Sequence, residues 1–151
     1  MALLKPRDAD KVREIFAQRL EGEVTITCFT QGESVLIIPG QECETCRSTR
    51  ELVEEVVALA PDKLHLQVKD FIRDKELARQ MGVERIPAVV LEGAAEGKVR
   101  FYGIPAGYEF STLIQSLIDV STGSPELEDA TTEALARITR DLHIQVFVTP
   151  T

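Results

Sequence analysis

The stretch Gln41-Glu42-Cys43-Glu44-Thr45-Cys46-Arg47 places two cysteines three positions apart. It follows an apolar run at residues 35–38 and precedes an amphipathic helical pattern at residues 47–60. The start of a helix suits a reactive thiol, because unpaired backbone N–H groups and the helix dipole favour a thiolate over a thiol. We therefore expect this stretch to carry the chemistry and the helix after it to pack into the core.

The spacing of the two cysteines predicts dithiol–disulfide exchange. If the helix begins at about Cys43, that sulfur lies over its N-terminus and Cys46 lies one turn further along on the same side. A thiolate at Cys43 that had attacked a disulfide would then have a second sulfur within reach to release the product. Cys43 is the expected nucleophile and Cys46 the expected resolving thiol.

Two cysteines at this spacing also fit half of a zinc site. A structural zinc ion usually has four ligands, and the other cysteine and histidine residues, Cys28, His65 and His143, lack ligand spacing. We expect no metal. Cys28 alternates with Val24 and Ile26 in a β-branched run, which predicts a buried, unreactive thiol. His65 is expected on the polar side of a strand, at the surface.

Length and charge limit the class of protein. The chain has 151 residues, enough for one full domain and a small extra piece. A net charge of −8 without a basic run argues against nucleic-acid binding. No apolar segment is long enough to span a membrane, and residues 1–20 have a charged amphipathic pattern unlike a signal peptide. We expect a cytoplasmic protein, where a CxxC pair is typically catalytic, and the absence of asparagine favours a thermophilic source.

The order of elements predicts an α/β fold with a mixed central sheet flanked by helices. An N-terminal helix capped at Asp8 or Asp10 should run to about residue 20, and Pro87 should open a strand, with Ile86–Pro87 a candidate cis peptide bond. Residues 35–38 fit either a short strand or a loop. The remaining expected elements are strands at 24–30, 64–68, 87–91 and 98–102, and helices from about 43 to 60, 74–81 and 108–120.

The C-terminal residues, from 121 onward, are not expected to belong to this α/β domain. Residues 121–125 form an expected linker, residues 126–141 a charged helix, and residues 144–148 an apolar strand with nothing after it to pair with. An unpaired apolar strand is expected either to pair with another copy of the chain, giving a dimer through residues 144–148, or to fold back on its own sheet.

Three motifs carry a resemblance to a known family: Cys43-Glu44-Thr45-Cys46, Arg85-Ile86-Pro87-Ala88 and the segment FYGIPAGYEF at residues 101–110. Together with the element order they resemble the N-terminal unit of the protein disulfide oxidoreductases, glutaredoxin-like proteins of thermophiles with two thioredoxin-like units in tandem. The resemblance covers nearly the whole chain and implies a thioredoxin-like fold. It implies that residues 1–123 form one such unit, and that residues 124–151 are the linker helix and first strand of a missing second unit.

The resemblance also implies a function. Members exchange the disulfides of protein substrates and receive electrons from a flavoprotein of the thioredoxin reductase type, with no bound cofactor beyond the redox-active disulfide, here Cys43–Cys46. Ile86–Pro87 would be cis, would pack beside the sulfurs and would contact an extended substrate. We assign Glu44 and Thr45, between the cysteines, to the same substrate-binding surface.

Some residues depart from the family pattern. Many thioredoxin-fold enzymes place a buried carboxylate on the strand that enters the active site, where this sequence has Ile37 and Ile38, so the proton acceptor for Cys46 stays unassigned. Glu44 adds negative charge beside Cys43 and argues against strongly oxidising behaviour. The alternative function is a non-catalytic docking or electron-relay module of a larger redox assembly, such as a peroxide-reductase flavoprotein.

Overall fold

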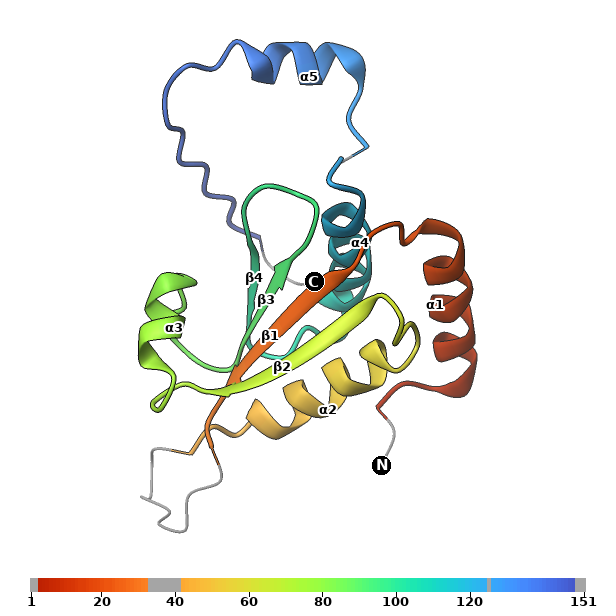
Figure 1. Ribbon diagram of the computed structural model, residues 1–151, viewed down its shortest axis with the longest axis vertical. Coiled ribbons are helices and arrows are strands. Elements are labelled where there is room, and N and C mark those ends of the chain that lie inside the picture. Colours follow the sequence, from red (N-terminus) through yellow and green to blue (C-terminus); the bar gives the residue numbers. More distant parts are fainter. Residues whose placement is uncertain (1–2, 33–41, 125, 149–151) are drawn as a thin grey trace.

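The computed structural model describes residues 3–32, 42–124 and 126–148. Figure 1 shows a central sheet with helices around it and a C-terminal segment that projects away from it. The elements in chain order are α1 (Pro6–Arg19), β1 (Val24–Thr30), α2 (Cys46–Val57), β2 (Leu64–Asp70), α3 (Lys75–Gln80), β3 (Ala88–Glu92), β4 (Val99–Tyr102), α4 (Tyr108–Thr122) and α5 (Asp129–Ala136).

The sheet is mixed, as the sequence predicts. Its strand order is β2-β1-β3-β4, with β1 parallel to β2, and β3 antiparallel to both β1 and β4. The parallel pair is joined by α2, the crossover helix that such a pair needs. The end of β1 and the start of α2 therefore meet at one edge of the sheet, where the two cysteines lie.

The side chains of β1 alternate between two hydrophobic clusters, one on each face of the sheet. Val24, Ile26 and Cys28 belong to the larger cluster, which contains buried residues of α1, α2 and α4. Phe29 belongs to the smaller cluster, with residues of β3, α3 and the segment that follows α3. Figure 1 shows α3 apart from α1, α2 and α4. Both faces of the sheet are thus covered, which accounts for the nearly continuous burial of β1.

Helix α2 joins the site to the core. Leu52, Val53 and Val56 are buried on its inner side, as the apolar spacing predicts. Its outer side carries two ion pairs at i,i+4 spacing, Arg47–Glu51 and Arg50–Glu54. The helix is therefore fixed along one side by packing, which gives its first residue a defined position.

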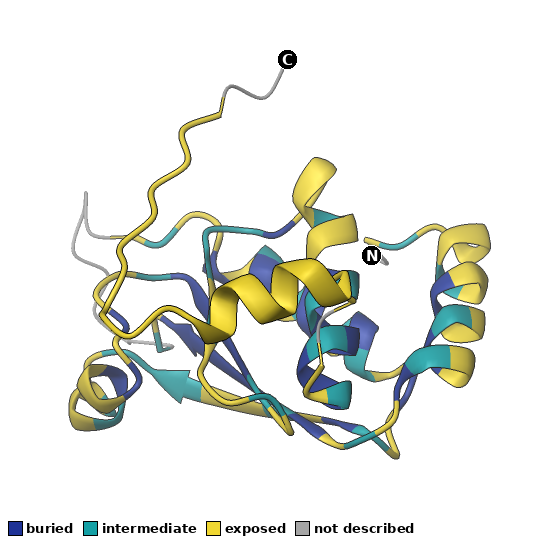
Figure 2. Cartoon of the chain, turned by 90° about the horizontal axis from the view of Figure 1, so that it is seen from above, coloured by how far each residue is buried: buried dark blue, intermediate teal, exposed yellow. Residues whose placement is uncertain are grey.

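The C-terminal part differs from expectation. Helix α5 is shorter than the expected 126–141 and buries none of its residues. Residues 144–148 form no strand, and the side chains of Ile144, Val146, Phe147 and Val148 are 78–88% exposed. In Figure 2 this whole segment is coloured as exposed and leads away from the core. The predicted strand and its return to the sheet are wrong for a single chain, because a strand forms only against a partner; dimerisation stays a prediction.

The other boundaries shift by a few residues. Helix α1 begins at Pro6, before the expected aspartate caps, and β2 continues to Asp70. Helix α4 reaches into the expected linker and ends at Thr122, followed by the C-cap Gly123, which has a φ of +68°. Residues 35–38 lie outside the described residues, so the choice between strand and loop stays open.

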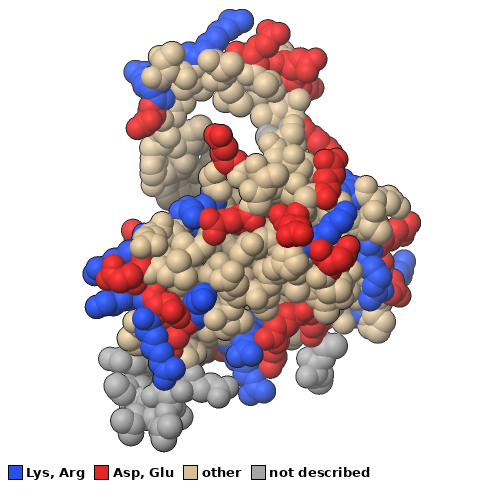
Figure 3. Space-filling model, viewed as in Figure 1, with Lys and Arg blue, Asp and Glu red and all other residues tan. Residues whose placement is uncertain are grey.

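Two surface properties bear on partners. On the face shown in Figure 3, lysine and arginine side chains are interspersed with aspartate and glutamate. Across the described ranges, no helix combines the length and the apolar character that crossing a bilayer requires.

Candidate functional site

The two cysteines of the CxxC pair form a disulfide. Sγ of Cys43 is bonded to Sγ of Cys46, with 5.4 Å between the two Cα atoms. Cys46 is buried at 5% exposure, whereas Cys43 is partly exposed. Cys43 is therefore the more accessible of the two residues to an incoming thiolate.

The helix begins later than the sequence predicts. Its first residue is Cys46, not Cys43, and Thr45 is the N-cap. The N–H of Cys46 donates to the carbonyl oxygen of Cys43 at 3.3 Å, and the N–H of Thr49 donates to that of Thr45 at 2.8 Å. Residues 43–46 thus form a turn before the helix. The expectation of a helix from about Cys43 is wrong, although the disulfide still keeps Cys43 at the N-terminal end of α2.

Gln31, directly after β1, contacts both cysteines. Its side-chain Oε1 accepts a hydrogen bond from the N–H of Cys43 at 2.7 Å. Its backbone N–H donates to Sγ of Cys46 at 3.4 Å. The sequence analysis assigns this residue no role in the site.

Asp70, at the end of β2, supports the same loop. Its carboxylate accepts hydrogen bonds from the N–H groups of Arg73 and Ile72, each at 2.8 Å, and from the N–H of Gly32. The bond from Arg73, followed by the bond from Ile72, the charge of Arg73 and the bond from Gly32, lowers the pKa of Asp70. A Cβ at position 32 would lie 1.8 Å from Oδ2 of Asp70, so only glycine permits this approach.

The Ile86–Pro87 peptide bond is cis, as expected. Pro87 is buried and Ile86 is partly exposed. The antiparallel register of β1 and β3 ends with the pair of Phe29 and Ala88, two residues before Gln31 and one residue after Pro87. The cis-proline turn and Gln31 therefore lie at the same end of the β1–β3 pair, and Gln31 contacts both cysteines there.

The remaining predicted site residues fall into two groups. Glu44 and Thr45 are exposed in the turn between the cysteines, where a substrate can reach them. Ile37 and Ile38, which stand where a carboxylate is common, lie outside the described residues. Gly32 is the sequence signal that points to the Asp70 contact, since a glycine after a strand can mark a close approach of backbone to another group.

The third cysteine is unreactive by position. Cys28 is completely buried, and desolvation raises the pKa of its thiol to about 12. His65 is exposed on β2, with Nε2 3.4 Å from a carboxylate oxygen of Glu23. Both positions agree with the sequence-based expectations.

Among the residues that the structure describes, no group of three or more His, Cys, Asp or Glu side chains has an arrangement that could hold a metal ion. In this structure the two CxxC sulfurs are bonded to each other.

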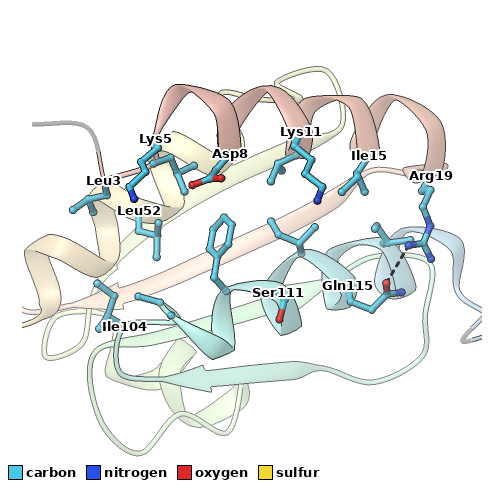
Figure 4. Close-up of a pocket in the computed structure, with 17 residues that line it drawn as sticks. Leu3, Lys5, Asp8, Lys11, Ile15, Arg19, Leu52, Ile104, Ser111 and Gln115 are labelled. Carbon is cyan, nitrogen blue, oxygen red and sulfur yellow. Dashed lines mark hydrogen bonds between the residues drawn. The ribbon is translucent and has the colours of Figure 1, made fainter. Parts of the chain in front are cut away.

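A separate cavity of about 610 Å³ lies between α1 and α4. Figure 4 shows Lys11 and Ile15 on α1 facing Ser111 and Gln115 on α4, with Arg19 hydrogen-bonded to Gln115 at 3.1 Å. Among the described residues, no cysteine lines this cavity. The cavity is therefore separate from the reactive centre, which is the disulfide between Cys43 and Cys46 at the start of α2.

Solved structures with the same architecture belong to longer chains. A protein disulfide oxidoreductase from Aeropyrum pernix is 29% identical, with a TM-score of 0.71 over 88% of this chain and 54% of that one. The alkylhydroperoxide reductase component AhpF of Enterococcus faecalis is 22% identical, with a TM-score of 0.73 over 89% of this chain and 60% of that one. The chain thus spans a little over half the length of these relatives. At that identity, the second likeness shows the fold alone.

A comparison with curated protein sequences found no match. The sequence model of the thioredoxin domain matches residues 34–115, more than half of the chain. This match covers the CxxC disulfide, the cis-proline turn and about the first half of α4. The mixed sheet, its covering helices and the disulfide are those of a thioredoxin-like thiol–disulfide redox domain, and the chain belongs to the thioredoxin-domain family.

Proposed function

We propose that the chain is a thiol–disulfide oxidoreductase that acts on the disulfides of protein substrates. The observation that carries this proposal is the disulfide between two unequally exposed residues, the partly exposed Cys43 and the buried Cys46. An exchange catalyst needs one sulfur that a partner can reach and a second that can displace the partner afterwards. The likeness to the Aeropyrum pernix protein disulfide oxidoreductase supports the same activity.

In the reducing direction, both cysteines start as thiols. The thiolate of Cys43 attacks a substrate disulfide, forming a mixed disulfide and releasing one substrate sulfur as a thiolate, which takes a proton from water. Cys46 then loses its proton and attacks Sγ of Cys43. The internal disulfide forms, the mixed disulfide breaks, and the second substrate sulfur leaves. Two electrons pass from the protein to the substrate.

The proposed substrate surface consists of Ile86 and Pro87 beside the disulfide, with Glu44 and Thr45 in the turn. Ile86 lies two residues before β3 and is partly exposed, so an extended peptide can approach its backbone there. An Ile86→Asp substitution should raise the KM for a protein disulfide more than it lowers kcat, because it alters binding rather than the sulfurs. A Glu84→Gln variant, exposed two residues earlier, is the control.

The direct test is reduction of insulin disulfides with dithiothreitol as electron source. The wild-type chain should accelerate precipitation of the insulin B chain, and Cys43→Ser should abolish the effect. Cys46→Ser should accumulate a mixed disulfide between Cys43 and the substrate, visible by mass spectrometry. Cys28→Ala is the matched control and should retain activity. Full turnover by Cys43→Ser would refute the proposal.

The electron donor in this proposal is a flavoprotein of the thioredoxin reductase type that uses NADPH. Consumption of NADPH by such a reductase in the presence of the chain and insulin would measure this coupling. Loss of the coupling in Cys43→Ser but not in Cys28→Ala would assign it to the disulfide.

The second candidate is an electron-relay module of a larger redox assembly. This candidate is supported by the likeness to the AhpF structure, with a TM-score of 0.73, because that protein is a subunit of an alkylhydroperoxide reductase and contains the same fold. A relay would accept electrons from its flavoprotein yet reduce insulin no faster than the Cys43→Ser control. This pair of measurements separates the two functions.

We also propose that residues 124–151 connect this unit to a second thioredoxin-like unit. The exposure of α5 and of the apolar side chains within residues 142–148 supports this proposal, because these residues are available to pack against another unit. Co-expression with a separate second unit, followed by gel filtration, tests whether these residues recruit it.

A further inference from the structure

Gln31 approaches the disulfide from the end of β1 and contacts both of its cysteines. Its side chain accepts from the N–H of Cys43 at 2.7 Å, while its backbone N–H donates to Sγ of Cys46 at 3.4 Å. These contacts use different groups of one residue, so each can be removed without the other.

The contact with Cys46 gains importance when the disulfide opens. As an external thiolate attacks Sγ of Cys43, a bond forms between these two sulfurs and the Cys43–Cys46 bond breaks. The bonding electron pair leaves with Sγ of Cys46, which becomes a thiolate. Cys46 is only 5% exposed, so water solvates this charge poorly. A hydrogen bond from an N–H group is stronger to a charged acceptor than to a neutral one.

The position of Gln31 is fixed from both neighbouring residues. The N–H of Phe71 donates to the carbonyl oxygen of Thr30 at 3.0 Å. The N–H of Gly32 donates to the carboxylate of Asp70, which the N–H groups of the following turn hold in place. The loop around Gln31 is therefore tied to the end of β2 on both sides of the residue.

We propose that Gln31 is the positioning residue of the exchange: its side chain holds the Cys43 backbone for attack, and its N–H stabilises the leaving sulfur of Cys46, with Asp70 fixing the loop through Gly32. The inference rests on the proposed function and adds to it a group that favours the reduced state. It also supplies a stabilising contact for Cys46 where the sequence offers no assigned carboxylate.

Two substitutions separate the two contacts. Gln31→Pro removes the N–H at a position just outside β1, whereas Gln31→Ala removes the side-chain acceptor and keeps the N–H. The control is Gln80→Ala, at the exposed end of α3. The readout is the equilibrium of each protein with reduced and oxidised glutathione over a range of pH, quenched with acid and measured by mass spectrometry.

Gln31→Pro should shift the equilibrium toward the disulfide by about tenfold, because the reduced state loses a hydrogen bond to a charged sulfur. It should also move the pH dependence of the equilibrium to higher pH, which a loss of folding stability alone would not do. Gln31→Ala should shift this equilibrium less and instead slow the alkylation of Cys43 by iodoacetamide by about fivefold. Gln80→Ala should match the wild type in both measurements.

Unchanged equilibria and alkylation rates in both Gln31 variants would overturn the inference. If Gln31→Pro fails to fold, Asp70→Asn replaces it and should shift the equilibrium in the same direction, while a wild-type equilibrium in that variant would count against the proposal. Because the readout uses glutathione, it is independent of the insulin assay. If the wild type fails to turn over insulin while the Gln31 variants shift the glutathione equilibrium, the proposed function is refuted. If the wild type turns over insulin while the Gln31 variants leave that equilibrium unchanged, only the role of Gln31 is refuted.

Discussion

The guanidinium carbon of Arg85 lies 4.5 Å from the centroid of the Tyr102 ring. Tyr102 is the last residue of β4, pairs with Ala88 and donates its hydroxyl hydrogen to the carbonyl oxygen of Gly82 at 3.1 Å. The ring therefore links β4 to the chain on the approach to Ile86. These contacts stabilise the entry to β3, where the proposed substrate surface begins.

A double-mutant cycle measures this stacking. Arg85→Ala and Tyr102→Ala should show a coupling of about 0.5–1 kcal/mol in the free energy of unfolding by urea, the range of an exposed cation–π pair. Arg79→Ala is the control, since Arg79 is exposed on α3 and paired with Glu76. The effects of Arg79→Ala and Tyr102→Ala on the free energy of unfolding should add. If the effects of Arg85→Ala and Tyr102→Ala also add, the stacking is contradicted.

The buried thiol of Cys28 should make the protein less stable in alkali. Its pKa is raised by burial from the ordinary 9.0 to about 12. Between these values the unfolded chain releases a proton that the folded chain keeps, so stability is complete below pH 9 and falls as pH rises toward 12. The slope should be steeper in the wild type than in Cys28→Ala by up to about 1.4 kcal/mol per pH unit. Urea unfolding of both oxidised proteins gives the difference, and identical slopes would place Cys28 in contact with solvent.

The carboxylate of Asp70 should matter most near neutral pH. Its pKa is lowered, chiefly by the hydrogen bond from Arg73. Its stabilising effect is therefore present above the ordinary carboxyl value of 3.8 and is lost as pH falls through the lower folded value. Asp70→Asn should cost about 1 kcal/mol at neutral pH and should approach the wild type in strong acid. Thermal unfolding at several pH values tests this, with Asp62→Asn, an exposed aspartate, as the control.

Removal of the C-terminal segment should leave the domain folded. Helix α5 buries no residue, and the ion pair between Arg19 and Glu126 is mainly exposed. A chain that ends at Ser124 should keep its free energy of unfolding within about 1 kcal/mol of the full chain. A chain that ends at Gln115 is the contrast, because it loses the buried Leu117; it should not fold. Circular dichroism during urea titration measures both.

Much of the fold was predictable because its signals are local. The alternation of Val24, Ile26 and Cys28 gave the buried face of β1, and the apolar spacing in α2 gave its inner side. The end of α4 was placed too early, since the polar residues before Gly123 fit either a linker or a last turn. The strand at 144–148 failed for another reason: apolar alternation predicts that residues can pair, and it does not supply the partner.

The site was predictable only in its sulfurs and its proline. The start of α2 was missed because a CxxC sequence fits both a helical turn and a turn before a helix, and the hydrogen bond from Cys46 to Cys43 decides between them. Gln31 was missed because its contacts join residues 12 and 15 positions away. Nothing in a local pattern reports such distances.

Three cysteines allow three ways of forming one disulfide. With Cys28 enclosed in the larger cluster at 0% exposure, two of these would require the sheet to open. The folded chain can therefore form only the disulfide between Cys43 and Cys46, and the redox state of the solution decides whether it is formed or reduced. The burial of Cys28 thus prevents its thiol from exchanging with the Cys43–Cys46 disulfide.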